Sequence, residues 1–138
     1  MKTEQEIFEE LRTLLPDVLG VRLEQVQRSS VLVADLGAES IDLLDLSFQI
    51  EDKFKVTIEA NEIEREARKR LPWVLYEKDG LLTEEALVEI RTRVPGLDPS
   101  KLVKGLRKSD FSALLTVEFF VQLIARKLAE KTEEVAHV

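Results

Sequence analysis

An uninterrupted helix-forming run extends from Ile41 to Phe54 and constrains the fold more than any other stretch of the chain. At about 100° per residue, the run divides its apolar residues between two opposite sides. The side predicted to pack on a core carries Leu43, Leu46, Ser47, Ile50 and Phe54. The other side carries Ile41, Leu44 and Phe48, interleaved with Asp45, Glu51 and Asp52. Because a buried face would not tolerate unpartnered carboxylates, we expect this second side to face solvent and make transient contacts.

The residue before this run is a serine that lies where a loop is expected to become a helix. The surrounding stretch reads Asp35-Leu36-Gly37-Ala38-Glu39-Ser40-Ile41-Asp42-Leu43-Leu44. Ser40 therefore stands between the carboxylates of Glu39 and Asp42, and we expect its hydroxyl to be exposed at the helix start. Serine is also a favoured N-cap residue, so these residues alone leave open that Ser40 only caps the helix.

Composition limits the classes of function that the chain can have. Its 138 residues, 44% of them hydrophobic, suit one domain with a single modest core. The net charge of −7 argues against nucleic-acid binding and favours basic partners. There is no cysteine, and the one histidine, His137, stands in the last two residues. We therefore expect no disulfide, no cysteine nucleophile and no Ser-His-Asp triad at Ser40.

The first forty residues predict one helix and a packed loop. Thr3 and Glu6 fit a capping box, and an apolar face at helical spacing follows. Pro16 should break or kink this helix, and Gly20 should end it. Residues 21–34 show no sustained period, which predicts a loop with one turn near Leu23 to Val26. A strand at residues 31–33 would find no partner.

The stretch around Ser40, with Leu19-Gly20-Val21 before it and Phe54-Lys55-Val56-Thr57-Ile58 after it, resembles the acyl carrier proteins. In that family a serine in an Asp-Ser-Leu motif carries a 4′-phosphopantetheine arm through a phosphodiester. Ser40 matches this serine, while Glu39 and Ile41 stand where Asp and Leu are usual. The resemblance covers residues 3–58 and resumes at about Asp110.

The resemblance implies an all-α fold, an acyl-carrier-like four-helix bundle in a single domain of residues 1–138. Its short third helix would lie at residues 110–115, and its last helix would run from Thr116 to Lys131 with the polar tail fraying beyond. About fifty extra residues, approximately 60–108, form an additional helical insertion between the second helix and the last helices. The insertion should hold a helix at residues 62–71 and a turn at residues 78–80. A second helix should begin after the N-cap Thr83 and end at residues 95–96, followed by a turn or two from residues 98–99.

The insertion differs from its host in charge. Residues 59–110 hold eleven acids and eleven bases, so the whole charge of −7 belongs to the carrier-like part. Its basic residues, at 68–70 and at 101, 104, 107 and 108, read most simply as solvated helix faces. A second hypothesis is that Trp73, Leu75 and Tyr76 widen the apolar interior of the bundle for a bulky acyl chain. A third is that the insertion is a docking surface for one dedicated enzyme.

The resemblance implies a non-catalytic carrier in fatty-acid, polyketide or related lipid biosynthesis, with acyl groups held as thioesters on the arm at Ser40. The resemblance places partner recognition on the helix after Ser40, and the candidate recognition residues are Asp35, Glu39, Ile41, Asp42, Leu44, Asp45, Phe48, Glu51 and Asp52. The partners would be a phosphopantetheinyl transferase and acyl-transferring, ketosynthase or acyl-activating enzymes with basic docking surfaces. We expect a monomer.

Other readings of the chain receive less support. An unmodified helical adaptor that binds basic proteins through the same helix is the alternative. A hydrolase lacks a base for Ser40, and the acids around it lack the spacing of a calcium loop. The N-terminus has no signal-peptide core, and no apolar run is long enough for stable membrane insertion, so we expect a cytoplasmic protein.

Overall fold

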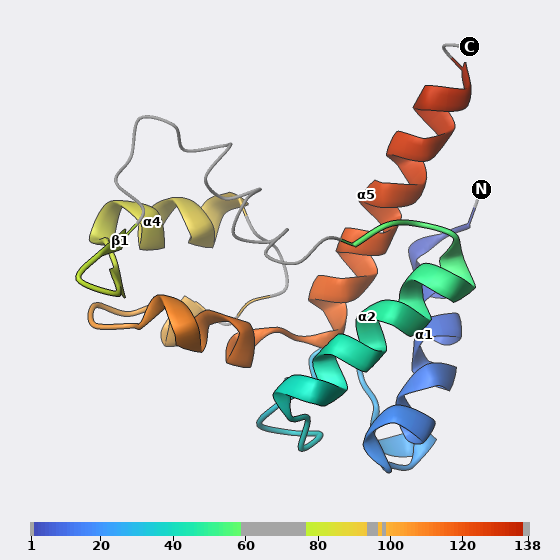
Figure 1. Cartoon of the computed structure of the whole chain (residues 1–138), viewed down its shortest axis with the longest axis horizontal. Coiled ribbons are helices and arrows are strands. Elements are labelled where there is room, and N and C mark those ends of the chain that lie inside the picture. The colour runs from blue at the N-terminus through green and yellow to red at the C-terminus, as the bar shows by residue number, and fades with distance from the viewer. Residues whose placement is uncertain (1, 59–76, 94–96, 98, 137–138) are drawn as a thin grey trace.

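The computed structural model describes residues 2–58, 77–93, 97 and 99–136. These residues are mostly helical, which confirms the all-α prediction, with one short hairpin added. Three long helices, α1 (Glu4–Leu19), α2 (Ser40–Phe54) and α5 (Val117–Ala136), form a bundle in which α1 packs against both others (Figure 1). The predicted short third helix is the 3₁₀ helix η3 (Lys108–Leu114), which leads directly into α5. None of the described helices combines the length and apolar content that crossing a bilayer requires.

The bundle core forms from one apolar face of each long helix. Helix α1 contributes Ile7, Phe8, Leu11 and Leu15, α2 contributes Leu46, Ile50 and Phe54, and α5 contributes Val117, Phe119, Phe120, Val121, Leu123 and Ile124. The rings of Phe119 and Phe120 meet edge to face, with centroids 5.7 Å apart. The predicted inner side of α2 is therefore confirmed.

Helix α1 keeps its predicted caps but not its predicted break. The hydroxyl of Thr3 accepts a hydrogen bond from the Glu6 amide at 3.1 Å, and Gly20 ends the helix with φ of +69°. The expected break at Pro16 is wrong, because α1 runs through this residue in one piece. Proline removes one hydrogen bond, but Leu11 and Leu15 are fully buried beside it, and each such burial contributes about 1.5–3 kcal/mol.

Helix α5 is longer than the sequence predicted. It continues to Ala136 instead of ending at Lys131. The residues after Lys131 include glutamates and an alanine, which favour the helix, and no glycine or proline interrupts them. The fraying that was predicted beyond Lys131 from polar composition alone is therefore wrong for residues 132–136.

The loop between α1 and α2 is fixed to the start of α5. It contains the predicted turn as η1 (Leu23–Gln25). Val31 forms an isolated antiparallel bridge with Thr116, and the Leu32 amide donates to the Leu115 carbonyl at 3.1 Å. The prediction that an extended segment here would lack a partner is wrong, since the partner lies immediately before α5.

The described part of the insertion folds into a hairpin and one helix. Strands β1 (Glu77–Lys78) and β2 (Leu81–Leu82) pair antiparallel across Asp79 and Gly80, which both have positive φ as a two-residue hairpin turn requires. Helix α4 (Glu84–Arg93) begins where the Thr83 hydroxyl accepts from the Ala86 amide at 3.1 Å, as predicted. A 3₁₀ turn, η2 (Pro99–Lys101), follows. The expected helix at residues 62–71, the stop at residues 95–96 and the cap at residue 98 lie outside the described residues.

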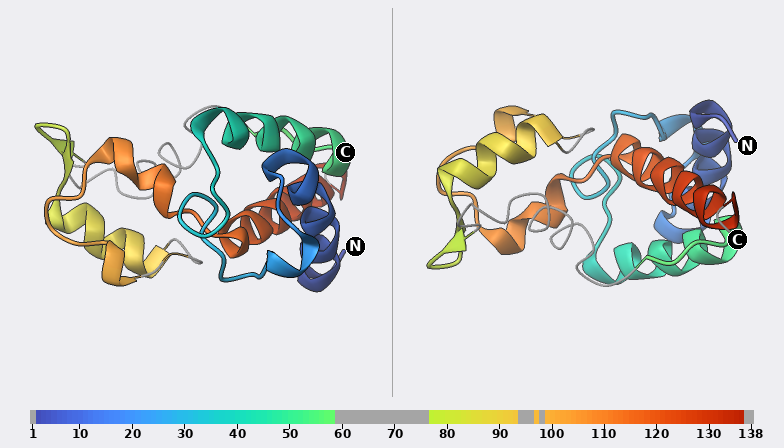
Figure 2. Two further views of the ribbon diagram at one scale, coloured as in Figure 1. Left: turned by 90° about the horizontal axis from the view of Figure 1, so that it is seen from below. Right: turned by 90° about the horizontal axis from the view of Figure 1, so that it is seen from above.

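The insertion has a small hydrophobic core of its own. Its buried members are Leu82, Ala86, Leu87, Ile90, Leu102 and Phe111. Figures 1 and 2 show this part to one side of the bundle, at the end where α2 and α5 begin. Helix η3 joins the two cores, because Phe111 lies in the second core while Leu115, just after the helix, lies in the first.

Candidate functional site

Ser40 is the first residue of α2 and does not cap it. The N-cap residue is Glu39, whose extended backbone directs its carbonyl to the amides of Asp42 and Leu43 at 3.0 and 3.1 Å. Ser40 is exposed, and its hydroxyl forms no hydrogen bond with any described residue. The capping explanation for this serine is therefore excluded, and its predicted exposure is confirmed.

Buried side chains and hydrogen bonds hold the loop before Ser40 in a fixed conformation. Leu36 and Ala38 are buried in the bundle core, and the Ala38 amide donates to the Leu32 carbonyl at 2.9 Å. The Asp35 carboxylate accepts from the Val31 amide at 2.7 Å. Gly37 turns the chain with φ of +74°, a conformation that costs glycine little. The serine is thus held at a fixed position although its side chain is free.

The start of α2 suits a bound phosphodiester without clamping it. The amides of Ser40 and Ile41 have no acceptor among the described residues, and a helix N-terminus stabilises an anion by about 0.3–1 kcal/mol. The neighbouring carboxylates of Glu39 and Asp42 oppose this attraction with terms of similar size. The residues present therefore fit a phosphate attached to the serine and leave whatever it carries free to move.

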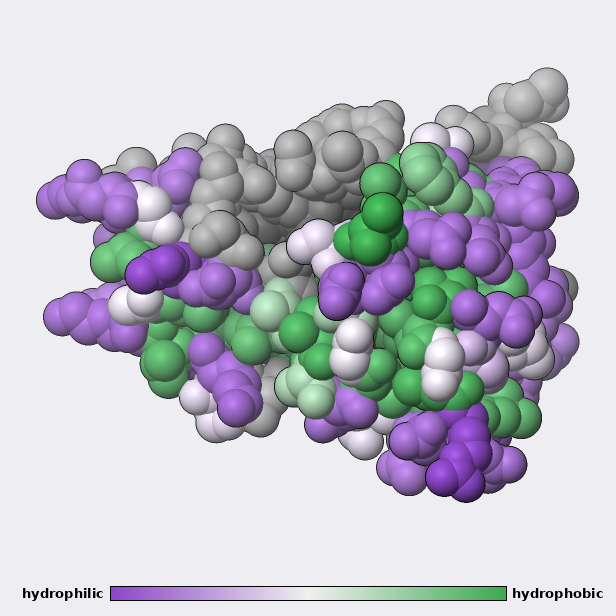
Figure 3. All heavy atoms as spheres, turned by 60° about the horizontal axis from the view of Figure 1, so that its bottom comes forward, coloured by the Kyte–Doolittle hydropathy of each residue, from purple (hydrophilic) through white to green (hydrophobic). Residues whose placement is uncertain are grey.

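The outer side of α2 exposes an apolar stripe. Ile41, Leu44 and Phe48, here called the outer stripe, are 70%, 56% and 59% exposed. Spacings of three and four residues place them in one row along the helix. Figure 3 shows apolar atoms exposed between polar ones over the bundle. This confirms that the second apolar side of the helix faces solvent.

The predicted acidic recognition residues divide into two groups. Glu39, Asp45 and Asp52 are exposed, and the contact of Asp52 with Lys55, at 3.8 Å between highly exposed groups, is weak. Asp35, which is also exposed, and the partly buried Asp42 and Glu51 accept hydrogen bonds from the backbone amides of Val31, Glu39 and Ile58 respectively. The second group therefore has a structural task that sequence reasoning did not assign to it.

The described residues around Ser40 present the hydroxyl but do not activate it. A serine needs a nearby base or metal to become a nucleophile, and no base contacts this one. No group of three or more histidine, cysteine or acidic residues suited to a metal occurs in the part of the chain that the structure describes. His137 lies outside that part.

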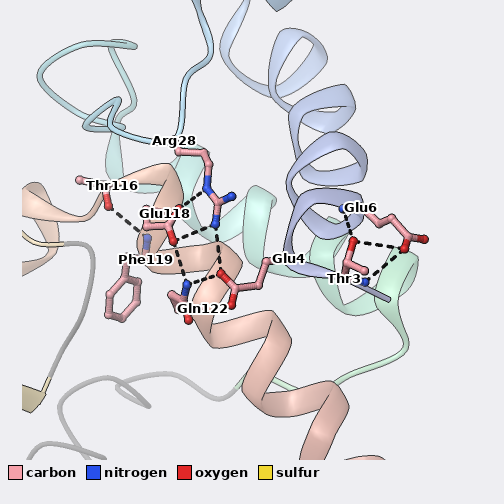
Figure 4. Close-up of polar contacts among 8 residues, drawn as sticks. All are labelled: Thr3, Glu4, Glu6, Arg28, Thr116, Glu118, Phe119 and Gln122. Carbon is pink, nitrogen blue, oxygen red and sulfur yellow. Dashed lines mark hydrogen bonds and ion pairs between the residues drawn. The ribbon is translucent and has the colours of Figure 1, made fainter. Parts of the chain in front are cut away.

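A polar hub that sequence reasoning missed links α1, α5 and the loop between α1 and α2. The Arg28 guanidinium, from the loop, pairs with Glu118 on α5 and donates to Glu4 on α1 at 3.1 Å (Figure 4). Gln122 donates to both glutamates, at 2.7 Å and 2.8 Å. The hydrogen bond from Arg28 lowers the pKa of Glu118, although partial burial opposes this, and the same bond raises the pKa of Arg28. No local pattern could reveal the hub, because its members are far apart in the sequence.

The sequence of this chain is similar to those of known carrier proteins. Residues 9–67 match the family model described as a phosphopantetheine attachment site. The acyl carrier protein of Thermotoga maritima is 35% identical over 65 residues, which cover 47% of this chain and 80% of that protein. That of Guillardia theta is 42% identical over 40% of this chain and 68% of its own length. That of Petrotoga mobilis is 36% identical over 46% of this chain and 74% of its own length.

Proposed function

The chain belongs to the acyl carrier proteins, non-catalytic carriers of a covalent 4′-phosphopantetheine group, and we propose that Ser40 is its attachment residue. The observation that supports this assignment most directly is the exposed, unbonded hydroxyl of Ser40 at the first turn of α2. Other serines in the described part are less suited: Ser30 is buried, and the Ser47 hydroxyl donates to the Leu43 carbonyl at 3.0 Å. Ser29 is exposed, but it lies in a turn and not at the start of a helix.

The proposed role is transport of acyl intermediates in fatty-acid, polyketide or related lipid biosynthesis. When bound, the group supplies a thiol that holds an acyl chain as a thioester. The protein's own contribution is to fix Ser40 in space while leaving the attached phosphate unclamped, because the helix dipole and the flanking carboxylates nearly cancel. A mobile arm can then reach successive active sites on other enzymes.

The outer stripe and the exposed acids beside it are the proposed recognition surface. Carriers of this family interact with a phosphopantetheinyl transferase and with biosynthetic enzymes. Asp45 and Asp52 would attract basic docking surfaces at long range, and the outer stripe would supply small apolar contacts of short lifetime. Partner affinity should fall steeply with added salt, and salt-independent binding would count against this surface.

Intact-mass measurement tests the attachment site. The full chain is incubated with coenzyme A and a broad-specificity phosphopantetheinyl transferase, and we expect a mass gain of one phosphopantetheine group. Ser40→Ala should show no gain. Ser29→Ala, at an exposed serine in the preceding loop, is the matched control and should gain the group fully. A wild-type chain that stays unmodified would favour the alternative, an adaptor that binds basic proteins through α2.

A further inference from the structure

A basic segment lies on the insertion, between α4 and η3. Residues 99–107, here called the basic segment, contain Lys101, Lys104 and Arg107 and no acidic residue. All three side chains are exposed, and none forms an ion pair with another described residue. The segment is therefore opposite in charge to the exposed acids of α2.

The backbone of the basic segment is held in place from both sides. Leu102 is buried in the second core, and its carbonyl accepts a hydrogen bond from the Arg91 side chain. The Leu106 amide donates to the Val103 carbonyl at 3.1 Å, closing a turn, and the Leu106 carbonyl accepts from Leu82 at 2.9 Å. Since the segment is already ordered, docking on it would cost little backbone entropy.

Exposed apolar side chains lie among these cations. Val103, between the two lysines, is 51% exposed, and Leu81, whose backbone bridges to Arg107, is 40% exposed. Apolar groups with charged groups at the rim are the composition of a protein contact surface.

The insertion that carries the basic segment lies at the Ser40 end of the bundle, and residues 102–107 lie at its far tip beside the β1–β2 hairpin (Figures 1 and 2). The chain continues from it through η3 to residues 115–117, and these pair with the loop that leads to Ser40. Figures 1 and 2 agree that α2 begins at the end of the bundle that faces the insertion. An enzyme that docks at Ser40 would therefore have to extend along the insertion to contact the basic segment as well.

Building on the proposed function, we infer that the basic segment is a second docking surface for an enzyme that acts on the arm at Ser40. This enzyme carries an acidic patch that meets the basic segment, in addition to a separate basic patch that meets α2. A protein with two patches of opposite sign matches both surfaces at once. An anionic membrane or nucleic acid has no basic patch to meet the acids of α2, which would repel it.

Site-specific photocross-linking in cells of the source organism tests this inference. A photoreactive amino acid replaces Val103 in one full-length variant and Phe48 in another, and cross-linked proteins are identified by mass spectrometry. We expect both positions to capture one and the same enzyme of phosphopantetheine-linked acyl chemistry. With that enzyme purified, Lys104→Glu should weaken its binding about two- to five-fold, the size of one surface ion pair. Arg22→Glu, an equal charge change on the bundle, should leave binding unchanged.

Several results would overturn the inference. Cross-linking from position 103 to only lipid, nucleic acid or a second copy of this chain would overturn it. The absence of any cross-linked product at this position would do the same. An enzyme whose affinity is unchanged by Lys104→Glu would overturn it as well. The mass of the protein recovered from the same cells reports separately on the arm. If the wild-type chain carries no phosphopantetheine there, the proposed function fails, whatever the cross-links show.

Discussion

The bundle and the insertion are two regions built on different scales. The bundle core is formed by three helices of 15 to 20 residues. The insertion core is formed by one helix of ten residues, a hairpin with two residues in each strand, and turns. Helices and hairpins this short are marginal by themselves, so the insertion depends on its few buried side chains. The comparison teaches that the bundle supplies stability and charge, while the insertion supplies additional surface.

The largest effect should follow truncation in the bundle core. Ile124 is fully buried, and Ile124→Ala should lower the free energy of unfolding by about 2–5 kcal/mol because it removes apolar contacts and leaves a cavity. Urea titration measures this loss. Val88→Ala, at an exposed apolar residue of α4, is the control and should change stability by less than about 0.5 kcal/mol. Similar small losses from both variants would mean that the bundle does not dominate stability.

Truncation in the insertion core should act locally. Ile90 is as buried as Ile124, so Ile90→Ala should destabilise the insertion by a similar amount, about 2–5 kcal/mol. Hydrogen exchange should then show loss of protection in α4, with the amides of α1 and α5 still protected. Attachment of the arm should continue in this variant. If both regions lose protection together, they form one cooperative unit, and the insertion does not unfold independently of the bundle.

The hub around Arg28 should give the bundle an acid-sensitive contribution of about 1 kcal/mol. The pKa of Glu118 is lowered in the folded protein, so the stability it provides is complete above the ordinary range of glutamate titration. That stability is lost as pH falls through the folded pKa. Glu118→Gln should lower stability at neutral pH and flatten this acid-side loss, as thermal melts across the acidic range would show. An unchanged pH profile would contradict the role of the hub.

The smallest effect on stability is expected on the outer stripe. Phe48→Ala removes a side chain that is 59% exposed, so the free energy of unfolding should change by less than about 0.5 kcal/mol. Binding to the transferase should nevertheless weaken about three- to ten-fold, the loss of a modest interface contact. Val88→Ala, with comparable exposure on the insertion, should leave transferase binding unchanged. Equal effects of the two variants would show that recognition is not concentrated on α2.

The sequence predicted the elements whose signals are local. The capping box at Thr3, the two-sided pattern of α2, the exposed Ser40 and the start of α4 after Thr83 all depend on neighbouring residues, and the structure confirms each. The acyl-carrier family also followed from a short stretch, because the motif and its flanks are contiguous.

The features that the sequence did not predict depend on distant partners. Val31 pairs with Thr116 and Arg28 with Glu118, and no short window contains both members of either pair. The break expected at Pro16 reflected backbone preference alone, whereas burial of Leu15 decided the outcome. The role of Trp73, Leu75 and Tyr76 in widening the bundle for an acyl chain stays a prediction, since these residues lie outside the described part.

The balance of charge in the insertion has a kinetic consequence. Since its eleven acids and eleven bases cancel, it adds little to the field that surrounds the molecule, and at physiological salt that field fades within about 8 Å. A distant enzyme would therefore be guided by the same acidic potential whether or not the extra residues were present. Their contribution would begin only after encounter and would change how long a complex persists, leaving the rate of its formation nearly unaltered.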